Sequence, residues 1–170
     1  MPFWNSTTQH PAINTAPKKA SWLVLGVVLI GGFEGLYLHP YRDVVGVKTV
    51  CYGATAADHV DLTRSYTKAE CDAMFEKDLP KYDAMIQKCI SKDAYNDLQS
   101  NPHRHVAIVS FVYNLGSGPV CHGRLNSDLN RGAIDAACHD LLAYDHAGGR
   151  RIKGLTTRRQ KEYTWCMMKG

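Results

Sequence analysis

Three residues in the first third of the chain carry side chains suited to acid–base chemistry. Glu34 and Asp43 lie nine positions apart, and Thr49 follows six positions later. Hydrolysis of a glycosidic bond needs one carboxylic acid to protonate the leaving oxygen and a second group to handle the attacking water. A threonine hydroxyl can help to orient that water. Two acids and a threonine at such spacings also occur in many proteins that catalyse nothing, so spacing alone does not establish catalysis.

The surroundings of the two acids predict different environments. Glu34 ends an apolar run and is followed by Gly35 and Leu36, so we expect apolar neighbours, which favour the protonated carboxyl. Asp43 lies in a segment rich in Val, Tyr and Thr, where we expect a more solvated strand and an ionised carboxylate. The two acids would then face one cleft from a helix end and from a hairpin.

The elements that must hold these residues follow from local signals. Val, Tyr and Thr with glycines predict a β-hairpin over residues 41–55. A capping box of Thr67 and Glu70 predicts the start of a helix, which Pro80 should kink or break. Asn101 and Pro102 predict the start of a buried apolar helix. Further helices are expected at 123–131, 133–144 and 157–168, the last opened by a second capping box in "TRRQ". Residues 89–104 run into the helix start at Asn101, and we assign no role to this stretch.

These elements give an α+β fold in which a small β-hairpin lobe at residues 41–66 faces a larger helical lobe. Clefts between such lobes are natural ligand sites. A chain of 170 residues is large enough for one domain with its own core.

The N-terminal part has a different composition. Residues 1–19 contain three prolines and end in two lysines, which predicts a disordered tail with a basic end. Residues 20–33 are almost wholly apolar, and the lysines before them favour an orientation in which the following chain crosses a membrane. The run is shorter than the roughly 20 residues of a stable span. A cleaved signal peptide, a core helix and a weak signal-anchor are the alternatives, and the anchor fits best. The remaining domain would be 34–170.

The net charge of +4 is concentrated near the C-terminus, which suggests either an anionic partner or, more simply, a solvated basic helix face. The six cysteines form no C-x-x-C pair, and H-E-x-x-H is absent, so we expect no metal and no cofactor. An even cysteine count beside a possible export signal suggests disulfides, although the sequence does not choose among the possible pairings.

The stretch "FEGLYLHPYRDVVGVKTVCYGAT" resembles the signature of the phage-type lysozymes, which include T4-like and lambdoid endolysins. Glu34, Asp43 and Thr49 match its acid, acid and threonine. Two later blocks agree in order, "SFVYNLGSG" and "AGGRRIKGLTTRRQKE". The chain departs from the family pattern at two places: Cys51, where many members have glycine, and Cys121-His122-Gly123. Lambdoid members that have a membrane-associated N-terminus share the cysteine at the position of Cys51.

The resemblance implies a lysozyme-like fold. It also implies a muramidase that cuts the β-1,4 bond between N-acetylmuramic acid and N-acetylglucosamine of peptidoglycan during phage-induced lysis. It carries Glu34 over as the general acid, with Asp43 and Thr49 assisting the water, and it implies an inverting reaction. Thr55, Tyr113 and Asn114 become substrate-binding candidates. Arg158 and Arg159 are alternatives for an ion pair with an acid at the site.

The lambdoid relatives also imply a location. As signal-arrest-release endolysins, they are held by a weak anchor on the periplasmic face of the host inner membrane and then freed into the periplasm. Residues 20–33 would be that anchor. We expect peptidoglycan and the inner membrane as partners, no nucleic acid, and a monomer.

Two other functions remain as alternatives. A lytic transglycosylase would use Glu34 without a water-activating partner, and the presence of Asp43 and Thr49 argues against it. A non-enzymatic cationic protein that binds the wall or disrupts membranes would rest on the basic C-terminal segment alone.

Overall fold

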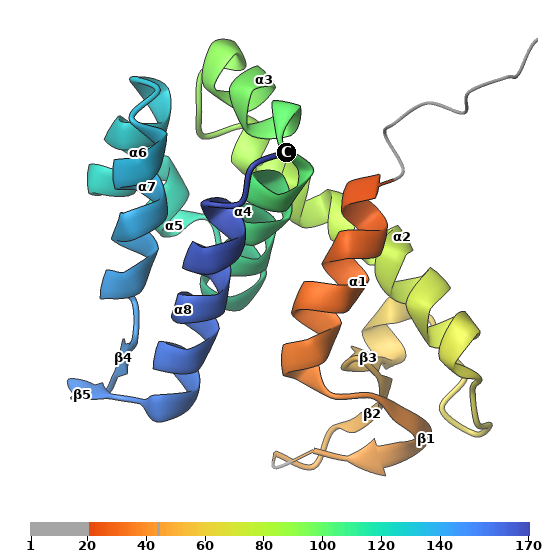
Figure 1. Ribbon diagram of the computed structural model, residues 1–170. Coiled ribbons are helices and arrows are strands. Elements are labelled where there is room, and N and C mark those ends of the chain that lie inside the picture. Colours follow the sequence, from red (N-terminus) through yellow and green to blue (C-terminus); the bar gives the residue numbers. More distant parts are fainter. Residues whose placement is uncertain (1–20, 44) are drawn as a thin grey trace, which may run out of the picture.

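The computed structural model describes residues 21–43 and 45–170, so the tail predicted at 1–19 lies outside the described residues. The elements are, in chain order, α1 (Ser21–Glu34), β1 (Tyr37–Arg42), β2 (Lys48–Cys51), β3 (Ala54–Thr55), the 3-10 turn η2 (Ala56–Asp58), α2 (Lys68–Gln87), α3 (Lys92–Ser100), α4 (Pro102–Leu115), α5 (Gly118–Cys121), α6 (Gly123–Asn130), α7 (Ile134–Asp140), η3 (Leu141–Ala143), β4 (His146–Ala147), β5 (Arg150–Arg151) and α8 (Lys153–Cys166). A small antiparallel sheet and a larger helical body therefore make up the fold, as predicted (Figure 1).

Helix α4 forms the centre of the helical body. Its residues from His105 to Val112 are all buried, and α1, α2, α3 and α8 pack around it. Asn101 caps its first turn by accepting hydrogen bonds from two backbone amides, Pro102 takes the first helical position, and Gly116 ends it. The start predicted from Asn101 and Pro102 is confirmed.

The apolar run at the N-terminus forms most of α1, which packs against α4 and α2 as part of the core. Leu29 and Ile30 are buried, whereas Val24 and Val28 are more than half exposed. The run therefore has a folded place in the protein, whatever its relation to a membrane. None of the helices in the described residues is both long and apolar enough to cross a bilayer.

The β lobe is a three-stranded antiparallel sheet in the order β1-β2-β3, one strand more than the predicted hairpin. Tyr37 lies opposite Cys51, and Tyr41 lies opposite Thr49. Two more residues lie between these pairs on β1 than on β2, so β1 contains an irregularity of the bulge type. Bulges bend a strand and increase its twist.

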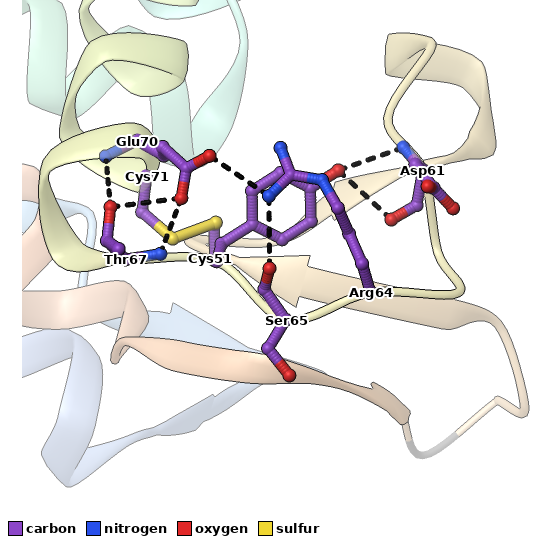
Figure 2. A network of polar contacts seen from close by, with 8 residues as sticks. Cys51, Asp61, Arg64, Ser65, Thr67, Glu70 and Cys71 are labelled. Carbon is purple, nitrogen blue, oxygen red and sulfur yellow. Dashed lines mark hydrogen bonds and ion pairs between the residues drawn. A yellow bond between two sulfur atoms is a disulfide. The ribbon is translucent and has the colours of Figure 1, made fainter.

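The β lobe is attached to the start of α2 by a covalent bond and a polar network (Figure 2). Cys51 and Cys71 form a disulfide. The predicted capping box is confirmed: the Glu70 amide donates to the Thr67 hydroxyl, and the Thr67 amide donates to the Glu70 carboxylate at 2.7 Å. Arg64 pairs with that carboxylate at 3.0 Å. The lobe and the helix are thus fixed as one unit.

The other four cysteines also pair, as Cys89–Cys121 and Cys138–Cys166. The first bond lies beside the unplaced segment 89–104, which forms α3 and the start of α4, and it ties the entry of α3 to the end of α5. The departure at Cys121 from the family pattern therefore has a structural partner in Cys89.

One local prediction was wrong in part and another was wrong. Pro80 does not break α2, since the helix continues past it to Gln87 with Pro80 on its exposed side. The last helix begins at Lys153 instead of residue 157, and no side chain caps it. Thr157 is an ordinary helical residue whose hydroxyl donates to the Lys153 carbonyl at 3.0 Å. "TRRQ" is therefore not a helix start.

Candidate active site

Glu34 is the last residue of α1, and its carboxylate faces α8. Gly35 follows with φ +76°, a conformation that favours glycine, and turns the chain toward β1. The Arg158 guanidinium donates from Nη1 to Glu34 Oε1 at 2.8 Å. About a quarter of the Glu34 side chain is exposed. A charge-assisted hydrogen bond of this kind fixes the position of the carboxyl oxygen.

Arg158 is itself held from behind by a second acid. Its Nε donates to Glu162 at 3.2 Å, and Ser110 on α4 donates to the same Glu162 oxygen at 2.6 Å. Arg159 pairs with the other Glu162 oxygen at 2.7 Å. Glu162 and Arg159 are fully buried and Arg158 nearly so, which makes this network part of the protein interior.

The network corrects two expectations about this region. The predicted solvated basic face is wrong for Arg158 and Arg159, because both guanidinium groups lie inside the protein. The expected apolar surroundings of Glu34 are only partly present, because Arg158 lies against its carboxylate. The Phe33 ring, 4.7 Å from the Arg158 guanidinium carbon, supplies the apolar part.

Asp43 and Thr49 are joined through one backbone residue, Val47. Asp43 Oδ1 accepts hydrogen bonds from the amides of Val45 and Val47 at 3.0 and 2.8 Å. The Thr49 hydroxyl donates to the Val47 carbonyl at 3.1 Å. A hydroxyl that donates to the backbone still has lone pairs with which to accept. Asp43 Oδ1 and the Thr49 hydroxyl are thus both fixed, and Asp43 Oδ2 and the Thr49 oxygen retain acceptor capacity.

The bend in β1 bears on how Glu34 and Asp43 are arranged. The strand begins three residues after Glu34 and ends one residue before Asp43. A straight six-residue strand would extend about 20 Å and separate the two acids. The irregularity between Tyr37 and Tyr41 bends it, and Figure 1 shows β1 turning back below the C-terminal end of α1.

A cavity of about 750 Å³ lies between the β lobe and α2, and Tyr113 of α4 also lines it. Its walls include Tyr52, Gly53 and Tyr82. Glu34, Asp43 and Thr49 do not line it. Tyr113 connects the cavity to the acid site, because its ring lies 5.8 Å from the guanidinium carbon of Arg158, the residue that pairs with Glu34.

The environment of Tyr113 keeps its hydroxyl protonated. Burial raises the pKa of Tyr113 above its ordinary value of 10.0, and the Glu34 carboxylate raises it further. The hydroxyl therefore remains a hydrogen-bond donor. Its ring also packs against Tyr82 at 4.8 Å and Phe75 at 5.7 Å, so an aromatic wall extends from the acid site into the cavity.

The other two substrate-binding candidates already have internal partners. The Thr55 hydroxyl caps η2 by accepting from the Ala57 amide at 3.3 Å and donating to Asp58 at 3.1 Å. Thr55 does not line the cavity, although its neighbours Gly53 and Ala54 do. Asn114 accepts a hydrogen bond from Arg159 at 2.9 Å and is partly exposed. Of the three, Tyr113 is the one that borders both the acid and the cavity.

The histidines and cysteines that adjoin one another in the sequence do not gather into a metal site. In the part of the chain that the structure describes, no group of three or more His, Cys, Asp or Glu is arranged to hold an ion. His105 instead contacts Asp83 at 2.7 Å inside the protein.

The comparisons with known proteins agree with this geometry. The family model named Phage lysozyme matches residues 31–162, which contain the acids, the sheet and the Arg158 network. The chain belongs to the phage lysozyme family. Membership makes it an enzyme of the glycoside hydrolase type and implies a peptidoglycan-lysing activity.

Two phage endolysins are similar to the chain over most of its length. The chain is 40% identical over 148 residues to the SAR-endolysin of Bacteriophage PS119, covering 87% of this chain and 84% of that protein. It is 38% identical over 148 residues to the SAR-endolysin of Enterobacteria phage P21, covering 87% and 86%.

Solved structures support the fold of the family. A crystal structure of a P22 lysozyme mutant matches with a TM-score of 0.72 at 21% identity, covering 85% of this chain and 96% of that one. The active form of the P1 phage endolysin matches with a TM-score of 0.64 at 22% identity, covering 84% and 82%.

Sequence reasoning missed several residues around the site. Ser110 and Glu162 lie in the two later blocks but were given no role, although a Glu four positions after Arg158 in a helix could have been recognised as an i,i+4 pair. No role was expected for Tyr82 in the wall of a cavity. Arg158, one of two alternatives, is the residue that pairs with Glu34.

Proposed function

We propose that the protein is a muramidase that hydrolyses the β-1,4 bond between N-acetylmuramic acid and N-acetylglucosamine. The observation that most supports this is the presence of two acids that the protein holds in different ways. Glu34 lies against a guanidinium, and Asp43 is fixed in a turn together with Thr49. One carboxyl to protonate and one to handle water is what glycosidic hydrolysis requires.

Glu34 acts as the general acid in this proposal. It must carry a proton when it meets the glycosidic oxygen, although it is paired with Arg158 in the free enzyme. Arg158 also donates to Glu162 at 3.2 Å, so it keeps one carboxylate partner, shared with Arg159, when Glu34 is neutral. The guanidinium can therefore hold Glu34 in place without depending on its ionisation. Loss of bulk water when sugar fills the site favours the neutral carboxyl.

Asp43 and Thr49 position the attacking water. The Thr49 hydroxyl already donates to the Val47 carbonyl, so a water would donate one hydrogen to Thr49 and the other to Asp43. The oxygen lone pair of that water is then free to attack the anomeric carbon. Asp43 takes the proton, and Glu34 gives its proton to the leaving oxygen, which balances the reaction.

The cavity beside Tyr113 offers room for sugar units next to the cut bond. Its volume of about 750 Å³ lies within the range of about 300–1,000 Å³ that is usual for ligand sites. Aromatic rings in its lining provide flat apolar surfaces, and the Tyr113 hydroxyl provides a donor. Thr55 and Asn114 are proposed to contribute less, because both are engaged within the protein.

Product analysis in ¹⁸O-labelled water tests the reaction type. Peptidoglycan digested by the purified full-length protein should release muropeptides whose new reducing ends contain one ¹⁸O atom. A lytic transglycosylase would instead leave unlabelled anhydro ends, and that result would refute hydrolysis. A cationic, non-enzymatic protein would release no cleaved glycan.

The domain plan and location are also proposed. Residues 20–33 would first act as a weak anchor on the periplasmic face of the host inner membrane, and release would let α1 pack against α4 and α2. The names of the two SAR-endolysin relatives and the lack of charge from Trp22 to Phe33 support this. Fractionation of infected cells before and after lysis would test it, because a protein never found in the membrane fraction contradicts the anchor. The active protein is proposed to be a monomer.

A further inference from the structure

Helix α1 touches the β lobe at a point where only glycine fits. Gly31 is buried against the ring of Tyr52. A Cβ atom built on Gly31 would lie 2.9 Å from Tyr52 Cε1 and 3.3 Å from its Cζ. The first distance is shorter than real carbon contacts, so any side chain at this position must move either the ring or the helix.

The Tyr52 ring is not free to move aside. Its hydroxyl donates to Asp72 at 2.7 Å, and its ring packs on Phe75 with centroids 5.0 Å apart. The residue is only 8% exposed. It directly follows Cys51, whose disulfide to Cys71 fixes the strand to α2 (Figure 2). The surface against which Gly31 packs is thus a rigid part of the β lobe.

Gly31 and Glu34 belong to the same helix, less than one turn apart. Three residues correspond to about 4.5 Å of rise, so a shift or rotation of α1 at Gly31 is passed to Glu34 almost unchanged. Arg158, the partner of Glu34, is on α8 and does not follow such a shift. The contact with Tyr52 therefore bears on the distance between the acid and its guanidinium.

We propose that Tyr52 is a positioning residue for the general acid. Its ring packs directly against the backbone of Gly31, and this contact sets how closely, and at what rotation, α1 packs against the β lobe. This inference rests on the proposed role of Glu34. It assigns Gly31 a structural role in the folded enzyme. This role does not depend on how strongly residues 20–33 partition into a membrane.

The neighbouring glycine provides the comparison that separates these two roles. A Cβ on Gly32 would meet no atom within 4 Å. Alanine at either position adds the same methyl group to the same apolar helix and improves helix propensity equally. Membrane partition therefore changes alike in both variants, and only the variant at Gly31 presses on Tyr52.

The experiment compares Gly31→Ala, Gly32→Ala, Tyr52→Leu and the double variant Gly31→Ala/Tyr52→Leu in the full-length released protein. Gly31→Ala should lower kcat by about 100-fold, the typical effect of misplacing a catalytic group by about 1 Å, while KM changes by less than about twofold. Gly32→Ala should keep wild-type kcat. Leucine lacks the outer ring atoms, so adding Gly31→Ala to Tyr52→Leu should cost no more than about twofold in kcat.

The last comparison also covers the case in which Gly31→Ala alone accumulates too poorly to assay. Equal activity of the two alanine variants would overturn the proposal, whether both are active or both inactive. So would a tenfold or larger loss of kcat on adding Gly31→Ala to the Tyr52→Leu background. Failure of the proposed function itself is distinguished by the wild-type protein, which would then release no labelled muropeptides.

Discussion

A buried aspartate outside the acid site offers a quantitative test of how the helical body is held. Asp83 on α2 is 7% exposed, and its carboxylate contacts His105 at 2.7 Å and the Tyr95 hydroxyl at 2.7 Å. Gln87 adds a longer hydrogen bond at 3.3 Å. Trp22 at the start of α1 packs on the His105 ring, with centroids 4.7 Å apart. The cluster therefore joins four helices.

Replacing Asp83 with Asn keeps the shape but removes the charge. A hydrogen bond to a charged group stabilises by about 1.5–3 kcal/mol, and Asn retains an acceptor for one partner. We therefore expect a loss of roughly 2–4 kcal/mol in unfolding free energy. For a chain of this size that lowers Tm by roughly 5–15 °C, since each kcal/mol corresponds to about 2–4 °C.

The pKa of Asp83 predicts how the stability difference between wild type and Asp83→Asn changes with pH. Burial acts to raise the pKa of Asp83, but the hydrogen bonds from His105 and Tyr95 outweigh it and leave the pKa below its ordinary value of 3.8. The stabilisation by the carboxylate is then present above the pKa of the unfolded chain and is lost as the pH falls through the folded value. Wild type and Asp83→Asn should thus differ at neutral pH and converge in strong acid.

Thermal unfolding followed by circular dichroism, with the disulfides intact, measures both effects. Asp97→Asn is the control, because Asp97 forms an exposed ion pair with Arg104 at 3.3 Å. Such pairs contribute about 0–1 kcal/mol. A Tm change in Asp83→Asn no larger than in the control, or a difference that persists unchanged in strong acid, would refute this account of the cluster.

Three further predictions concern other parts of the molecule. Arg158→Lys should lower kcat by about tenfold or more in a muralytic assay, because one ammonium cannot bond Glu34 and Glu162 with the geometry of a guanidinium; an unchanged kcat would contradict this. Burial and the nearby Asp128 raise the pKa of Asp140 despite Arg124, so the ionised Asp140 carboxylate is less favourable in the folded protein than in the unfolded chain. Asp140→Asn should therefore stabilise the protein more at neutral pH than at low pH, as measured by unfolding curves. A larger stabilisation at low pH than at neutral pH would contradict this prediction. Reduction of the three disulfides should lower the unfolding free energy by roughly 2–4 kcal/mol for each bond, measured in denaturant with and without reductant, and equal midpoints would count against a stabilising role.

The sequence predicted the parts of the fold whose signals are local. Thr67 and Glu70 are three residues apart, and Asn101 adjoins Pro102, so the residues that start these helices lie within one turn of each other. "TRRQ" has the same local pattern but failed, because the chain from Ile152 already enters the helix four residues earlier. A local pattern permits a helix start, and the packing of α8 against α4 decides where it falls.

The surroundings of the acid site depended on contacts that no local pattern encodes. Glu34 and Arg158 are 124 residues apart, and Ser110 reaches Glu162 from another helix. The disulfide pairing likewise required the fold, since 20 residues separate Cys51 from Cys71. The resemblance to phage lysozymes identified the catalytic candidates from their order alone, whereas the buried arginine network around them emerged only in three dimensions.

The central claim is that Glu34 supplies the proton for bond cleavage, and the muralytic activity of Glu34→Gln tests it most directly. Gln keeps the size of the side chain but cannot donate an acid proton, so kcat should fall by at least about 100-fold, in line with the usual contribution of a general acid. Glu76→Gln on α2 serves as the control and should keep wild-type activity. Near wild-type cleavage of peptidoglycan by a folded Glu34→Gln protein would contradict the account.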